Sequence, residues 1–205
     1  MTGTANSGAE VLVLASGSAT RASLLRRAGV PFLQDPATVD EAAAKARLKA
    51  KGAEAGLAAL ELARLKAREV SARHPGALVL GADQLLDCEG AWLDKPATRE
   101  RAKAQLLHLS ARSHRLETAA MLVRDGAERW SHLERPELRL RRLTPELVDA
   151  YLDAAGADVL HSVGAYQIEA HGAQLVEQLT GDVFAVLGLP LLPLLAALRR
   201  EGVLP

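Results

Sequence analysis

Short apolar runs alternate with segments of helical periodicity along this chain. Residues 11–14 read Val-Leu-Val-Leu and residues 78–80 read Leu-Val-Leu, and small residues follow both runs. Continuous apolar runs of this length are typical of strands that are buried on both faces. Longer segments with alternating apolar and polar positions predict further strands. These are a hairpin at 85–92, strands at 114–123 and 130–143, and a strand-like segment at 163–168 with 174–179 as its extension.

Capping residues mark where the helices begin and end. Ser18 precedes a segment with Leu24 and Leu25 on one side, and Gly29 follows that segment as a stop signal. Thr144 followed by Pro145 is a strong helix start, because proline fits the first helical position. The predicted helices are 19–28, an Ala-, Lys- and Glu-rich stretch from 35 to 70, a helix capped by Thr98 that runs to 109, 145–156 and 188–201.

The alternation of strands and helices predicts an α/β fold with a mixed sheet, some of whose strands lie at an edge or in a second lobe. A length of 205 residues suits one domain, so we expect a loose leader at 1–9 and a single domain at 10–205. The most apolar stretch, 183–198, is interrupted by two prolines and is too short to span a membrane. We therefore expect a soluble, cytoplasmic protein.

Composition excludes several classes of function. The 25 Lys and Arg residues balance 25 Asp and Glu residues, which argues against bulk electrostatic binding to a nucleic acid polymer or a membrane. Aromatic residues make up only 3% of the chain, too few for a base-stacking platform. A single cysteine, Cys88, excludes an internal disulfide and a cysteine-based zinc cluster, and it is consistent with a reducing compartment.

Ser16, Gly17 and Ser18 lie between the first predicted strand and the first predicted helix, and Arg21 follows on the first helical turn. Free N–H groups and the helix dipole favour anions at such a position, so this segment is a candidate phosphate cradle. It is not a Walker A loop, because no Gly-Lys-Ser/Thr follows. An ordinary capped helix with solvated arginines is the alternative interpretation.

Two further groups of charged residues are candidates for chemistry. Asp83 closely follows the second buried strand, where α/β folds place ligands, and it could bind a metal, act as a base or merely cap a turn. Glu41, Lys66 and Lys95 could bind a divalent cation and phosphate oxygens, or they could be solvated surface charges. The histidines at 108, 114, 161 and 171 lack metal-ligand spacing and are interpreted as surface or structural residues.

A series of short motifs extends along the chain between residues 11 and 203. They are Leu14-Ala-Ser-Gly-Ser-Ala-Thr-Arg21 with Leu24-Leu25, Val39-Asp-Glu41, Leu62-Ala63 with Lys66-Ala67, Gly81-Ala-Asp-Gln84, Asp94-Lys-Pro96, Leu109-Ser-Ala-Arg112 with His114, Gly164-Ala-Tyr-Gln-Ile-Glu169 and Gly188-Leu-Pro190. In this order, these motifs resemble those of the Maf family of nucleoside triphosphate pyrophosphatases.

The resemblance implies an elongated mixed sheet flanked by helices, with two lobes around a central nucleotide cleft. It also implies hydrolysis of a nucleoside triphosphate to a monophosphate and pyrophosphate with Mg²⁺ or Mn²⁺, and it suggests a homodimer. Asp83 would accept the proton from water, and Glu41 would help Asp83 to place the metal. The residues around the phosphates would be Ser16, Ser18, Arg21, Lys66 and Lys95.

The same resemblance favours 7-methyl-GTP, because Thr20, Gln84 and Glu169 match the subgroup similar to the 7-methyl-GTP enzyme. A carboxylate can accept both donors on the guanine edge, and a buried Glu169 would also favour the charge of a methylated base. The alternatives are a dTTP/UTP-type pyrophosphatase and a nucleotide-sensing regulator of septum formation. Asp94 and Ala170 depart from the family's usual glycines, and Asp94 adds a negative charge beside a phosphate lysine.

Overall fold

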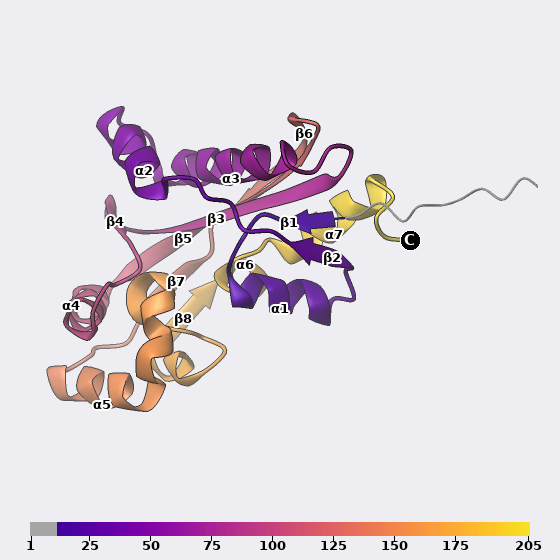
Figure 1. Ribbon diagram of the computed structural model, residues 1–205. Helices are drawn as coiled ribbons and strands as arrows, with labels where there is room; N and C mark the ends of the chain where they lie inside the picture. Colours follow the sequence, from indigo (N-terminus) through magenta and orange to yellow (C-terminus); the bar gives the residue numbers. More distant parts are fainter. Residues whose placement is uncertain (1–11) are drawn as a thin grey trace, which may run out of the picture.

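The computed structural model describes residues 12–205, which form a mixed sheet with helices on both faces (Figure 1). The strands are β1 (Leu12–Leu14), β2 (Phe32–Gln34), β3 (Leu78–Cys88), β4 (Ala91–Leu93), β5 (Ser113–Arg124), β6 (Ala127–Glu134), β7 (Glu137–Leu140) and β8 (Val176–Thr180). Their order is β2-β1-β3-β5-β7-β8, with β4 paired to β3 and β6 paired to β5. The predicted leader and the first residue of the first predicted strand lie outside the described residues.

The two longest strands, β3 and β5, form the spine of the sheet. They pair antiparallel from Val79 opposite Val123 to Asp87 opposite Arg115. At one end of β3 the parallel strands β1 and β2 continue the sheet, and at the other end β4 folds back as a hairpin. Likewise, β6 pairs with one half of β5 and β7 with the other half. The spine therefore branches into two lobes, which confirms the predicted mixed α/β fold.

Helices cover both faces of the spine and fill the second lobe (Figure 1). They are α1 (Ala19–Arg27), α2 (Glu41–Ala50), α3 (Ala55–Ser71), α4 (Arg99–Leu109), α5 (Pro145–Ala155), α6 (Val183–Val186) and α7 (Leu191–Arg200), with short 3₁₀ helices η1 (Gly156–His161), η2 (Val163–Ala165) and η3 (His171–Leu175). Within residues 12–205, no helix is both long enough and apolar enough to cross a membrane.

Three apolar clusters follow from the alternation of side chains along the strands. On one face, Val79 and Met121 pack with Leu62 of α3. On the other face, Leu80 and Leu122 pack with residues of α1 and α7. The third cluster joins the far ends of β3 and β5 to α4 and α5 in the second lobe. The cores thus lie on either side of the spine and at its far end.

The local capping signals are confirmed. Ser18, Thr98 and Thr144 each begin a helix, and each side chain accepts a hydrogen bond from the backbone N–H three residues further on. After α1, Gly29 adopts a left-handed conformation with φ of +71°, as expected for a glycine stop. These short-range interactions position the loop before α1 that was expected to bind phosphate.

The single helix predicted from 35 to 70 is wrong, because the chain forms two helices there. Residues 35–40 are not helical, and Asp40 caps α2 by accepting a hydrogen bond from Ala43 N. Gly52 takes φ of +71° and ends α2, and α3 begins at Ala55. The break allows α2 and α3 to run in different directions, so that both reach the same cleft.

Three strand predictions also need correction. The strand predicted at 78–80 continues to Cys88, so Asp83 lies within β3 rather than beyond its end. The strand predicted at 130–143 is divided into β6 and β7 at Pro136, which has no N–H for a strand ladder. Residues 163–168 form the short 3₁₀ helix η2 and an irregular loop, because Gly164 and Ala165 both have positive φ. Strand β2 was not predicted.

Gly81 is the point of closest approach between α3 and β3. A Cβ built on Gly81 would lie 2.1 Å from the carbonyl oxygen of Ala63 and 2.8 Å from the backbone nitrogen of Ala67. The neighbouring atoms belong to helix backbone, which cannot move aside cheaply. Glycine therefore sets the distance between α3 and the strand that carries Asp83.

We predict that Gly81→Ala lowers the free energy of unfolding by about 1–3 kcal/mol, as other overpacked cores do. Gly17→Ala is the matched control, because a Cβ there meets only Pro36 at 3.8 Å. Urea unfolding of both variants measures the effect. Equal stability of the two variants would show that this contact does not limit the packing.

Candidate active site

A cleft of about 1200 Å³ lies where the spine branches. The loop before α1, helix α2, the middle of β3, the loop after β4 and the segment 158–169 line it. Every residue predicted from the sequence to act in the site lies on the wall of this cleft. These residues are Ser16, Ser18, Thr20, Arg21, Glu41, Lys66, Asp83, Gln84, Lys95 and Glu169.

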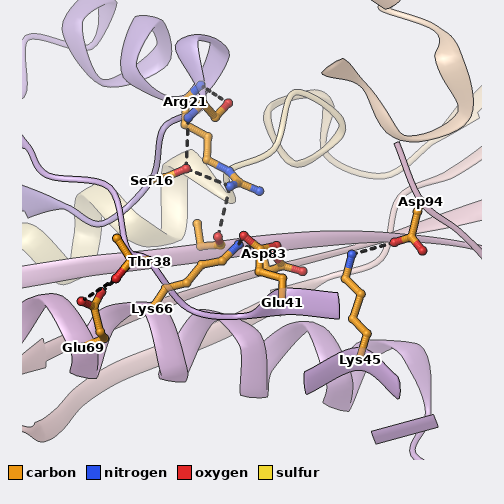
Figure 2. A network of polar contacts seen from close by, with 11 residues as sticks. Ser16, Arg21, Thr38, Glu41, Lys45, Lys66, Glu69, Asp83 and Asp94 are labelled. Carbon is orange, nitrogen blue, oxygen red and sulfur yellow. Dashed lines mark hydrogen bonds and ion pairs between the residues drawn. The ribbon is translucent and has the colours of Figure 1, made fainter. Parts of the chain in front are cut away.

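At the centre of the cleft, Lys66 lies between two carboxylates (Figure 2). Its Nζ is 2.6 Å from Asp83 Oδ1 and 3.0 Å from Glu41 Oε1. The side chains of Lys66 and Asp83 are only 8% and 6% exposed, whereas that of Glu41 is 46% exposed. Asp83 Oδ2 is buried and has no hydrogen-bond partner among the described residues. The site therefore contains an acceptor oxygen with no protein donor.

The periodicities of helix and strand bring Lys66 and Asp83 together. On β3, alternate residues face α3, so Asp83 continues the row that begins with Val79 and Gly81. On α3, Lys66 lies one turn after Leu62 and beside Ala63 on the buried face. Two charges are thus placed beside the apolar cluster between α3 and β3. Burial of such a pair is costly, which indicates a functional rather than a stabilising role.

Arg21 connects three separate segments of the chain. Its Nε donates to Gly188 O at 2.8 Å, and its Nη1 donates to Ala82 O and to Ser16 Oγ, both at 3.1 Å. Burial lowers the pKa of Arg21 from its ordinary value, and Asp83 and Glu41 counteract that effect. The guanidinium remains charged, as arginine does in proteins. Within the described part of the chain, only Nε and Nη1 of the guanidinium donate hydrogen bonds, so Nη2 is the nitrogen left for an anion.

Further cations lie on the wall of the cleft. Burial lowers the pKa of Lys95, and the nearby charges of Arg21 and Lys66 act in the same direction. Lys45 of α2, which the sequence analysis missed, forms a 2.7 Å ion pair with Asp94. Burial opposes the charge on Lys45, but the bond to Asp94 and the nearby Asp83 and Glu41 raise its pKa. The sequence could have indicated Lys45, because it follows Glu41 by four residues and therefore lies on the same face of a helix.

The carboxylates of Glu41 and Asp83 fit a hard divalent cation that also takes ligands from a substrate. Both carboxylates form an ion pair with Lys66, and Asp83 Oδ2 accepts no hydrogen bond from the described residues. Within residues 12–205, no group of three or more His, Cys, Asp or Glu side chains forms a complete metal site. Mg²⁺ is commonly bound in proteins by one or two carboxylates, with water and substrate phosphates as the other ligands.

Gln84 presents an acceptor to the cleft. Its Nε2 donates to Thr118 Oγ1 at 2.8 Å and to the carbonyl oxygens of Ala185 and Val186 at 2.9 and 3.2 Å. Because carbonyl oxygens only accept, these contacts fix the orientation of the amide. The Oε1 atom of Gln84 is therefore the atom left for a ligand.

Glu169 lies on the wall of the cleft but is exposed to solvent, so the expectation of a buried Glu169 is wrong. It follows the irregular loop that replaces the predicted strand, which places it at the rim. His161 also lies on the cleft wall rather than on a remote surface.

Tyr166 forms part of the same wall and is held from behind by His114. The Tyr166 hydroxyl lies 2.7 Å from His114 Nε2, and both residues are buried. Burial lowers the pKa of His114 to about 4, so the imidazole is neutral at physiological pH. His114 is thus structural, as one of the two interpretations of the sequence expected.

Comparison with known proteins places these residues in a family. Residues 11–201 match the family model described as "Maf-like protein". A protein of Paramagnetospirillum magneticum named "Nucleoside triphosphate pyrophosphatase" is 51% identical over 190 residues, covering 93% of this chain and 98% of that protein. A "7-methyl-GTP pyrophosphatase" of Mesorhizobium japonicum is 49% identical over 193 residues, covering 94% and 97%. A protein of the same name from Rhizobium etli is 44% identical over 191 residues, covering 93% and 96%.

His114 predicts a pH dependence of stability. Its pKa in the folded protein, about 4, lies below the ordinary value of 6.5, so the unfolded chain binds more protons between these values. The free energy of unfolding should therefore fall as pH drops from 6.5 to 4, with about 3 kcal/mol from this group. His114→Gln should lose less stability over that range. Parallel pH profiles of the two proteins in urea unfolding would refute the assignment.

Proposed function

This chain belongs to the Maf family, and from that membership we propose that it is an enzyme, a nucleoside triphosphate pyrophosphatase. It would hydrolyse a nucleoside triphosphate to the monophosphate and pyrophosphate. One observation carries the proposal: the buried Asp83 is paired with Lys66 at 2.6 Å, and its second oxygen accepts no hydrogen bond from residues 12–205, in a cleft lined with cations. A base, charge neutralisation and room for a nucleotide are what this reaction requires.

In the proposed mechanism, Asp83 Oδ2 accepts a hydrogen bond from the attacking water and takes its proton. The water oxygen bonds to the α-phosphorus, and the bond from that phosphorus to the bridging oxygen breaks, which releases pyrophosphate. Lys66 holds Asp83 Oδ1 at 2.6 Å, which orients the carboxylate and keeps a positive charge beside the reacting phosphate. Such fixed charges favour a transition state in which negative charge shifts to the leaving group.

The remaining phosphate contacts would come from the loop before α1 and from Lys95. Ser16, Ser18 and the N-terminus of α1 offer hydroxyl and backbone donors, and Arg21 anchors the loop to β3. Glu41 and Asp83 would hold a divalent cation, Mg²⁺ or Mn²⁺, whose chemistry is to neutralise phosphate oxygens and polarise the bond to phosphorus.

The proposed substrate is a modified guanine nucleotide, with 7-methyl-GTP as the first choice over dTTP and UTP. Guanine offers two adjacent donors, N1–H and N2–H, on one edge. The fixed amide of Gln84 presents Oε1 as an acceptor, and the Glu169 carboxylate at the rim supplies further acceptors. A methylated guanine is positively charged and is attracted to the Glu169 carboxylate, and the solvent exposure of Glu169 weakens that attraction. Thr20 lines the same cleft and offers a hydroxyl.

A panel of 7-methyl-GTP, GTP, dTTP, UTP and pseudo-UTP, each with Mg²⁺ and with Mn²⁺, tests the proposal. We expect pyrophosphate rather than orthophosphate as the product, with the highest kcat/KM on 7-methyl-GTP. Glu169→Gln should lower the preference for 7-methyl-GTP over UTP by about tenfold, the worth of one charge-assisted hydrogen bond.

Two results would contradict separate parts of this proposal. Release of orthophosphate, or no release from any member of the panel, would refute the pyrophosphatase assignment. Highest activity on UTP or dTTP, unchanged by Glu169→Gln, would refute only the role of Glu169 and Gln84 as guanine readers.

A further inference from the structure

Lys45 and Asp94 form an ion pair on the wall of the cleft. Lys45 lies on α2, and Asp94 lies in the loop between β4 and α4, 49 residues further along the chain. Their side chains are 2.7 Å apart, but they differ in exposure: Lys45 is 21% exposed and Asp94 is 68% exposed. Both residues line the cleft, and the lysine is the more buried partner.

The position of Lys45 on its helix directs it toward the reacting centre. Glu41 and Lys45 are four residues apart on α2, so their side chains lie on the same face. Glu41 reaches Lys66 at 3.0 Å from that face. Figure 2 shows Lys66, Glu41 and Asp83 at the centre of the group, with Ser16 and Arg21 above them and the Lys45–Asp94 pair to their right. Lys45 therefore adds a positive charge to the wall of the cleft at a place away from the loop before α1.

We propose that Lys45 binds the terminal phosphates of the triphosphate, and that Asp94 competes with the substrate for this lysine. This inference rests on the proposed function. A triphosphate carries several negative charges within reach of one ammonium group, whereas an exposed ion pair contributes little and is easily exchanged. Lys45 leaves Asp94 when substrate enters, and Asp94 recaptures it as pyrophosphate departs. Asp94 thereby weakens substrate binding and favours product release.

A purely structural ion pair would behave differently. If the pair only fastened α2 to the loop after β4, the loss of either partner would loosen the cleft, and both variants would weaken binding. If Lys45 exchanges partners, loss of the lysine weakens binding and loss of the carboxylate strengthens it. The sign of the effect therefore separates the two explanations.

The test compares Lys45→Met, Asp94→Asn and the double variant in buffer with Mg²⁺. KM for the triphosphate should rise about tenfold in Lys45→Met, and should fall by up to about fivefold in Asp94→Asn. In the double variant, KM should equal that of Lys45→Met, because Asp94 acts on the substrate only through Lys45. Lys103→Met and Asp149→Asn are matched controls, because this 2.6 Å pair is similarly exposed but does not line the cleft.

Calorimetric binding of inorganic triphosphate gives a readout that is independent of turnover. Lys45→Met should weaken that binding about tenfold but leave the binding of a nucleoside monophosphate unchanged. Unchanged binding in Lys45→Met, or Asp94→Asn that fails to tighten it, would overturn the inference even if the wild-type enzyme releases pyrophosphate. Absence of pyrophosphate release by the wild type would instead refute the proposed function.

Discussion

The ion pair between Lys66 and Asp83 is the interaction on which the rest of the cleft depends. Both side chains are almost completely buried, and their 2.6 Å contact is made inside a wall of alanines and leucines. Removal of a charged pair from water is expensive, and loss of Lys66 would leave the buried Asp83 carboxylate without its ion-pair partner, at a cost of about 3–5 kcal/mol. A nearby glycine, Gly81, lets α3 approach β3 closely enough for the pair to form. Burial of the pair lowers the stability of the fold, but it holds the Asp83 carboxylate in a defined position.

The remaining parts of the site are brought to this pair by long-range contacts. Arg21 fastens the loop before α1 to β3 at Ala82, next to Asp83, and to the loop before α7 at Gly188. Helix α2 brings Glu41 from the other side to the same lysine. The proposed phosphate donors, the carboxylate proposed to bind a metal and the proposed base thus converge from three elements. Their convergence accounts for hydrolysis of a triphosphate better than any of these groups does alone.

The sequence was informative where short-range physics decides the outcome. Ser18 caps α1 because its hydroxyl meets a backbone N–H three residues away, a contact that needs no tertiary information. Asp83 was predicted from its position beside a buried strand, and the resemblance to the Maf family pointed to both Asp83 and Lys66, but their burial was not predicted. The loop at 163–168 was mispredicted as a strand because Gly164 and Ala165 take positive φ in their tertiary context. Lys45 and Asp94 are 49 residues apart in the sequence, and their contact depends on the tertiary fold. The periodicity of the sequence predicts only local structure, so it could not predict this pair.

The central claim is that Asp83 acts as the base in pyrophosphate release, and turnover by Asp83→Asn tests it most directly. Asparagine keeps an oxygen for Lys66 but cannot take a proton from water. We predict that kcat falls at least about a hundredfold, as expected for loss of a general base, while circular dichroism, and nucleotide binding measured without a divalent cation, stay close to those of the wild type. Near-normal turnover by a folded Asp83→Asn protein would contradict the account.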